Sequence, residues 1–181
     1  MDLIEKPQKF VSSLVNAGLY KLDEKIFSII KNLKKSKRGE YELTDAIKNL
    51  STEEKIHCIK SREWLSIANA FDLLKADKII RKGKNHIGNN ARVNGKVANS
   101  SIGNGCIVEG TVKNSIIMGS TIVDKNSVVE GSVVGENAHI NGKISNSIIA
   151  DNVNIINALI KNSGITPNKT IKNKTIKNDE L

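Results

Sequence analysis

One phrase recurs three times in the second half of the chain, and this repetition constrains the fold more than any other feature. The three copies read GKVANSSIGN, GTVKNSIIMG and GKISNSIIAD, and they start at Gly95, Gly110 and Gly142. The surrounding segments align with spacings of 15, 15, 17 and 15 residues on five aliphatic residues, namely Ile87, Ile102, Ile117, Val134 and Ile149. Each segment divides into hexads such as IGNGCI and VEGTVK. Hexad repetition of this kind predicts a parallel β-helix, in which each coil stacks on the previous one.

The composition of the repeat fits a core built as a column of Ile and Val. One aliphatic residue of each short strand points inward and lies above its counterpart in the coil below, which leaves no room for rings. Aromatic residues make up only 3% of the chain, and none occurs between Ile87 and Ile160. We expect Gly95, Gly110 and Gly142 to turn tight corners with positive φ. The Asn–Ser pairs expected to stack as hydrogen-bonded ladders start at Asn99, Asn114 and Asn146.

The chain is expected to have three parts. Residues 1–84 are predicted to form a partial α/β domain, residues 85–163 an all-β left-handed parallel β-helix of about five coils, and residues 164–181 a basic, low-complexity tail. The tail is expected because its Lys and Asn residues alternate without a clear apolar pattern. Fold class therefore changes once along the chain, close to residue 84.

Residues 1–84 alternate between helical and extended patterns. Asp23 is the expected N-cap of a helix that ends at Lys34 and Lys35. The apolar stripe of this helix consists of Ile26, Ile29, Ile30 and Leu33. Two further helices are expected to start at Thr44 and after Asn69. Short strands are predicted at residues 16–22, 55–60 and 63–68.

Charge and cysteine content narrow the class of protein. The formal net charge is +9, but the lysines are spread along the chain and lack the interleaved aromatic residues that single-stranded nucleic acids stack on. We therefore expect no nucleic-acid partner. Cys58 and Cys106 lie far apart, which indicates a reducing compartment. No apolar stretch approaches the length that spans a bilayer, so a cytoplasmic location away from membranes is expected.

Five segments in a fixed order resemble the second half of the sugar-1-phosphate nucleotidylyltransferases. Four of these segments of the chain resemble the glucose-1-phosphate thymidylyltransferase-like group. They are IEKP (4–7), NAGLYKLDEKIFSII (16–30), SKRGEYELTDAI (36–47) and EWLSIANAFDLLKADKII (63–80). The fifth, NSSIGNGCIVEGTVKNSII (99–117), is similar to β-helix coils of ADP-glucose pyrophosphorylases. The resemblance covers nearly the whole chain up to about residue 160, and it implies a role in making nucleotide-activated sugars.

The resemblance also implies a sugar-phosphate site. In the family, the phosphate of a sugar 1-phosphate attacks the α-phosphorus of a nucleoside triphosphate, and catalysis depends on positioning and charge neutralisation. By this resemblance, Lys6 would bind the sugar phosphate and Glu5 would accept hydrogen bonds from sugar hydroxyls. Asn16 and the backbone at Gly18 would bind further hydroxyls. Each of these residues also has a structural explanation as a strand end, a turn or a packing position.

Parts of the family's machinery are missing from these 181 residues. They contain no G-x-G-x-R loop, and Ser66 stands two residues after Trp64, where the family has a metal-binding Asp. A neutral hydroxyl does not replace a carboxylate in holding Mg²⁺ against a triphosphate. We therefore expect no catalytic residue, no metal site and no cofactor for this chain alone, although the complete family uses Mg²⁺. A non-catalytic, regulatory or split subunit is expected, either pairing with a separate nucleotide-binding chain or forming a homo-oligomer through the β-helix.

A second interpretation is a hexapeptide-repeat acyltransferase acting on a sugar or a sugar phosphate. Such β-helices often bind acyl-CoA between subunits, and they need a His as general base. Of His57, His86 and His139, only His139 lies within the predicted coils. It ends the hexad VGENAH, where an outward-facing corner residue is the structural alternative.

Overall fold

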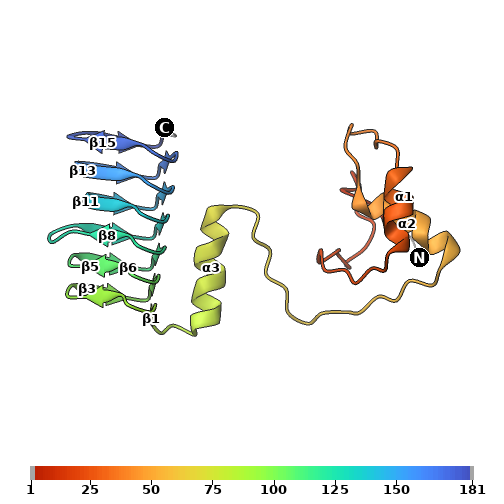
Figure 1. Ribbon diagram of the computed structural model, residues 1–181, viewed down its shortest axis with the longest axis horizontal. Coiled ribbons are helices and arrows are strands. Elements are labelled where there is room, and N and C mark those ends of the chain that lie inside the picture. The colour runs from red at the N-terminus through yellow and green to blue at the C-terminus, as the bar shows by residue number, and fades with distance from the viewer. Residues whose placement is uncertain (1–2, 180–181) are drawn as a thin grey trace. The chain divides into compact units, whose positions relative to one another are not determined.

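The computed structural model describes residues 3–179, and these divide into two compact units (Figure 1). One unit runs up to Trp64, and the other begins at Leu65. The first contains two short helices, and the second contains one helix and a parallel β-helix. The α/β part followed by a left-handed parallel β-helix was the predicted fold class, and the structure confirms it.

The first unit is held together by a small core between α1 (Lys25–Lys31) and α2 (Leu43–Glu53). The N-cap position of α1 is Glu24 rather than the predicted Asp23, although the Lys25 backbone N–H donates to the Asp23 carboxylate at 3.0 Å. The buried core residues are Ile26, Ala46 and Leu50, and Ile29, Leu33 and Ile56 pack against them. Helix α1 ends at Lys31, earlier than the predicted Lys34 and Lys35.

The three strands predicted in this region are wrong, because residues 16–22, 55–60 and 63–68 are irregular rather than paired. A strand is stabilised by the neighbour to which it donates its backbone hydrogen bonds, so strand propensity depends strongly on context. Among residues 3–64 no second extended segment pairs with any of them. The alternating apolar residues of these segments are present, but residues 3–64 contain no sheet with which the segments could pair.

The β-helix has three faces, each built from short parallel strands, and six coils. The first face is a six-stranded sheet of β1 (His86–Ile87), β4 (Ser101–Ile102), β7 (Ile116–Ile117), β10 (Val133–Val134), β12 (Ile148–Ile149) and β14 (Gly164–Ile165). The second face contains β2 (Arg92–Val93), β5 (Ile107–Val108), β8 (Ile122–Val123), the start of β11 (His139–Ser145), the start of β13 (Asn154–Lys161) and β15 (Thr170–Lys172). The third face contains β3 (Lys96–Ala98), β6 (Thr111–Lys113), β9 (Val128–Glu130), the ends of β11 and β13, and β16 (Thr175–Lys177).

The core of the β-helix is the predicted column of aliphatic side chains. Equivalent positions pair in register from coil to coil, as in Ile102 with Ile117. On the first face the inward residues of the second to fifth coils are at most 1% exposed; they are Ile102, Ile117, Val134 and Ile149. Since about 25 cal/mol is gained per Å² of apolar surface removed from water, such columns supply much of the stability of the fold.

The predicted tail is wrong, because residues 164–177 form the sixth coil. Strands β14, β15 and β16 continue the three faces, and Ile165, Ile171 and Ile176 are buried at the inward positions. The lysines of this segment point outward, which gave the stretch its low-complexity, basic character. One Ile on each face is sufficient to extend the column of aliphatic side chains, and the repeat requires no other apolar residue in this coil.

The corners are turned mainly by asparagines, which corrects the role expected of the glycines. Asn99, Asn114 and Asn146 have φ between 46° and 48°, whereas Gly95 and Gly142 are not among the residues with positive φ. Gly110 was also expected to have positive φ and does not, so the prediction is wrong for all three glycines. Glycine is required at these positions because the neighbouring coil leaves no space for a side chain. A Cβ on Gly95 would lie 2.0 Å from the Gly110 carbonyl oxygen, so only glycine allows the coils to stack this closely.

Helix α3 (Ala70–Arg81) belongs with the β-helix and covers part of its first face. The Asn69 side chain accepts hydrogen bonds from the Phe71 and Asp72 backbone N–H groups and caps its start, as predicted. The helix contacts β10, where the outward Val133 is only 3% exposed. For this reason the division between the units lies after Trp64 rather than at the expected residue 84.

Candidate functional site

Glu5 and Lys6, the first two residues of the predicted sugar-phosphate site, lie next to the start of α2. The Thr44 hydroxyl donates to Glu5 Oε2 at 3.3 Å, and Thr44 itself is buried. This bond ties the N-terminal segment to the first turn of the helix. Lys6 has a positive φ of 41° directly before Pro7, and its side chain is exposed. A non-glycine residue in this backbone region is uncommon and is found in turns and at functional sites.

Asn16 and Gly18 form a local turn of their own. The Gly18 backbone N–H donates to Asn16 Oδ1 at 3.0 Å, and the Asn16 amide donates to the Tyr20 hydroxyl. Gly18 has φ of 74°, which suits glycine. The two pairs of predicted residues are thus held by separate contacts, and their joint role in sugar-phosphate binding stays a prediction.

Ser66 occupies the position at which the family is expected to have a metal-binding Asp. Ser66 lies in an irregular, exposed segment after Trp64. Across residues 3–179, no group of three or more His, Cys, Asp or Glu side chains is arranged to hold a metal ion.

A second candidate site lies on the second face of the β-helix, where His139 meets Asp124. His139 Nε2 lies 2.9 Å from Asp124 Oδ1, and the Asn141 amide donates to Asp124 Oδ2 at 3.0 Å. The pair is brought together by the register of β8 and β11, in which His139 lies beside Ile122. The imidazole is 48% exposed, so it can meet a ligand from solvent.

The chemistry of this pair follows from what a carboxylate can do. An ionised carboxylate only accepts hydrogen bonds, so Nε2 carries the hydrogen and, in the neutral ring, Nδ1 holds the free lone pair. Such an arrangement orients an imidazole for use as a general base. His139 was predicted as the candidate, but Asp124 and Asn141 were missed. The aligned hexads carried the signal, since Asp124 and Asn141 each follow an inward aliphatic residue at the same place in neighbouring coils.

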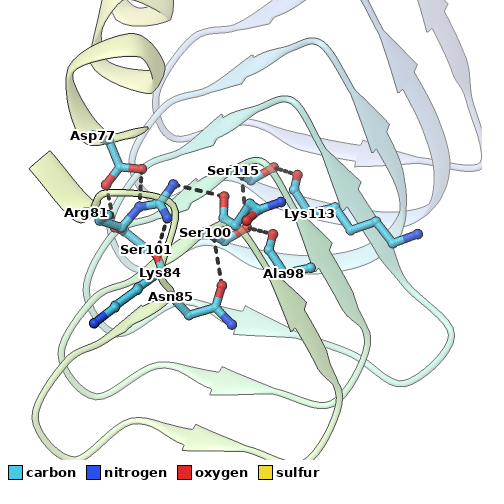
Figure 2. Close-up of polar contacts among 10 residues, drawn as sticks. Asp77, Arg81, Lys84, Asn85, Ala98, Ser100, Ser101, Lys113 and Ser115 are labelled. Carbon is cyan, nitrogen blue, oxygen red and sulfur yellow. Dashed lines mark hydrogen bonds and ion pairs between the residues drawn. The ribbon is translucent and has the colours of Figure 1, made fainter. Parts of the chain in front are cut away.

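A polar cluster between the end of α3 and the start of β4 has a structural role (Figure 2). Arg81 Nε donates to Asp77 Oδ2 at 2.6 Å, and Arg81 also donates to the Asn99 carbonyl at 2.9 Å and to the Lys84 carbonyl. The Ser101 hydroxyl donates to the other Asp77 oxygen. The Arg81 side chain is 8% exposed. These bonds fasten the end of α3 to the first two coils and use three of the five N–H donors of a nearly buried guanidinium.

No helix within residues 3–179 has the length and apolar character that a bilayer crossing requires.

Two family models match the chain. A nucleotidyl transferase model matches residues 1–83, and a model described as the GMPPB C-terminal domain matches residues 76–181.

Several curated relatives are described as bifunctional in their names. The bifunctional protein GlmU of Methanocaldococcus jannaschii is 45% identical over 103 residues, which cover 54% of this chain and 25% of that protein. The bifunctional sugar-1-phosphate nucleotidylyltransferase/acetyltransferase of Sulfurisphaera tokodaii is 31% identical over 102 residues, covering 52% and 25%. The low-salt glycan biosynthesis nucleotidyltransferase Agl11 of Haloferax volcanii is 30% identical over 105 residues, covering 53% and 29%. The aligned part of this chain thus spans about a quarter of the length of these relatives.

Proposed function

The chain belongs to the family of the GMPPB C-terminal domain, and we propose on this premise that it serves a sugar-1-phosphate nucleotidylyltransferase as its sugar-phosphate-binding and assembly part. The nucleotidyl transferase match over residues 1–83 agrees with the resemblance read from the sequence. In this proposal Glu5, Lys6, Asn16 and Gly18 face the sugar phosphate. A nucleotide-binding half of the family's fold supplies the triphosphate site and the Mg²⁺ ligands.

The observation that carries the proposal is the uncovered apolar surface of the first unit. Phe10 is 87% exposed, Leu19 is 92% exposed and Phe27, on α1, is 65% exposed. Soluble proteins rarely leave so many large apolar side chains in water unless a partner covers them. The core between α1 and α2 is small by comparison, so the unit gains most of its possible burial only through association.

Co-expression tests this proposal directly. The chain is co-expressed with the nucleotide-binding half of a sugar-1-phosphate nucleotidylyltransferase, and the mixture is separated by size exclusion. We expect a stable complex that forms a nucleotide sugar from a sugar 1-phosphate and a nucleoside triphosphate in the presence of Mg²⁺. Phe27→Glu should abolish co-elution, while Lys34→Glu, an exposed polar position, should not. A chain that stays monomeric and soluble in the presence of that half contradicts the proposal.

The β-helix is proposed to assemble copies of the chain. Its second face carries two outward, half-buried isoleucines, Ile107 and Ile122, which lie beside each other in register. Light scattering after size exclusion should report a mass larger than one chain of 19.8 kDa. The variant Ile107→Lys, Ile122→Lys should lower that mass if this face forms the contact.

The His139–Asp124 pair favours a second candidate function, acyl transfer to an amino sugar or a sugar phosphate. In this proposal the lone pair on His139 Nδ1 takes a proton from the acceptor as the acceptor attacks the thioester carbonyl. The carbon–sulfur bond then breaks, and the imidazolium returns the proton to the sulfur, so the donor leaves as a thiol. Asp124 holds the ring and stabilises the charge that develops on it. Acetyl-CoA consumption with a panel of amino sugars measures this activity. His139→Asn should reduce it by at least a factor of about 100, and wild-type protein without activity on the panel would leave the pair a structural contact.

A further inference from the structure

A groove runs along the corner between the second and third faces of the β-helix, in its last four coils. It has a volume of about 530 Å³. Three lysines and three corner asparagines contribute to its lining, namely Lys125, Lys143, Lys174, Asn126, Asn157 and Asn173. We name this feature the corner groove.

The floor of the corner groove is fixed by bonds between coils. The Asn157 amide donates to Asn173 Oδ1 at 3.1 Å, and the Asn157 backbone N–H donates to Asn141 Oδ1 at 3.2 Å. Asn157 and Asn173 both have positive φ, so they turn the corner in the same way in successive coils. Asn126 turns the corresponding corner of the 17-residue coil, with φ of 70°. A ligand therefore meets a backbone that is already ordered, which lowers the cost of binding.

The charged residues that line the groove are all lysines. Lys125, Lys143 and Lys174 come from three different coils, and the lining contains no carboxylate. The nearest acidic residue along the chain is Asp124, and its two oxygens already bond to His139 and Asn141. Like charges that converge without a counter-ion repel one another, and a bound anion removes that repulsion. Lysine ammonium groups are good donors to phosphate oxygens.

The spacing of the lysines favours an anion with more than one charged group. Lys143 and Lys174 belong to coils four and six, which are separated along the axis by two strand spacings, or roughly 9.6 Å. One phosphate group is too compact to engage ammonium groups from three coils as well as a diphosphate does. We propose that the corner groove binds the diphosphate group of an anionic ligand, which is either free pyrophosphate or the diphosphate of a nucleotide.

This proposal does not depend on the sugar-phosphate site proposed above, because the groove shares no residue with that site. The groove does share Asn141 with the His139–Asp124 site. Calorimetric titration of the full chain at low salt would use pyrophosphate, ADP and inorganic phosphate as probes. We expect pyrophosphate or ADP to bind at least tenfold more tightly than inorganic phosphate. Tighter binding of ADP would identify a nucleotide as the source, and equal or weaker binding would identify free pyrophosphate.

Matched variants separate a built site from general positive charge. Lys143→Gln with Lys174→Gln should weaken pyrophosphate binding at least tenfold. Lys96→Gln with Lys161→Gln removes the same charge from the third face outside the groove, and it should change binding less than twofold. If the groove variant unfolds, Lys143→Arg with Lys174→Arg keeps the charge and should retain binding. Equal loss in both glutamine variants, equal affinity for inorganic phosphate, or no binding to any probe would overturn the proposal.

Discussion

The hydroxyl of Ser100 accepts a hydrogen bond from the backbone N–H of Ser115 at 3.1 Å, and it donates to the Ala98 carbonyl at 2.8 Å. Ser115 repeats both bonds one coil further on. The ladder begins at Asn85, whose side chain accepts from the Ser100 N–H at 3.1 Å (Figure 2). Each rung therefore satisfies a buried backbone group of its own coil and one of the next.

Ser115→Ala should destabilise the β-helix by about 1–3 kcal/mol, because it leaves the buried N–H of Ser132 without its acceptor. Urea unfolding followed by circular dichroism measures the change. Ser145→Ala, at a half-buried outward position of β11, is the control and should cost less than about 0.5 kcal/mol. Equal effects of the two changes would show that the ladder contributes little.

Two glycine substitutions should have opposite outcomes. Gly142→Ala would place a Cβ 2.2 Å from the Ala158 carbonyl oxygen, and we expect a loss of more than about 2 kcal/mol. Gly105→Asn should be neutral or slightly stabilising, because Gly105 has φ of 68°, and its Cβ would lie 3.7 Å from the nearest atom. Thermal unfolding of both variants tests whether close stacking or corner geometry selects each glycine.

Arg81→Ala should loosen helix α3 from the first coils. The side chain is nearly buried and bonds to Asp77, so its removal leaves an uncompensated carboxylate at a cost of about 3 kcal/mol. Amide hydrogen exchange should show faster exchange in α3 than in the later coils. Lys75→Ala, which breaks an exposed ion pair with Asp72 on the same helix, is the control and should leave exchange nearly unchanged.

The two cysteines should differ in reactivity. Cys106 is buried in the column, its thiol donates to the Met118 carbonyl, and burial raises the pKa of this thiol. A raised pKa lowers the thiolate fraction at any given pH, so reaction with a disulfide reagent should be slow at pH 8 in the folded protein. The exposed Cys58 should react quickly, and Cys58→Ser should abolish the fast phase. Fast labelling of Cys106 in folded protein would contradict the placement of its side chain.

The same pKa shift sets a pH dependence of stability. The thiol is protonated in both states below its ordinary pKa, and its stabilising contribution is then complete. As the pH rises towards the raised pKa of the folded state, the unfolded state ionises first and stability falls. Cys106→Ser should remove this alkaline loss while lowering stability at neutral pH.

The β-helix was predictable because each coil is specified by its own residues. Ile102 and Ile117 occupy the same place in successive coils, so the repeat in the sequence is the register in the structure. The sixth coil was missed because Ile171 and Ile176 stand among lysines, and a column needs only one aliphatic residue per face. The role of Gly142 was also missed, since a close contact with Ala158 in the next coil leaves no local signal.

The first unit was harder to predict, because the formation of a strand depends on a pairing partner outside its own segment, and the three strands predicted there do not form. Residues 55–60 carry an extended pattern, yet pairing decides whether a strand forms. The His139–Asp124 pair was also predicted only in part from the sequence. His139 was predicted from its residue type, while Asp124 was missed although the aligned hexads place it one coil before Asn141.

The serine ladder stops at Asp179, whose backbone N–H donates to Ser163 while a carboxylate stands where another serine would continue. Because each of the five serine rungs between Asn85 and Asp179 makes the same two kinds of bond, adding or removing a whole coil would leave the remaining rungs with equivalent partners. The surface that the β-helix offers to partners therefore changes in steps of one coil.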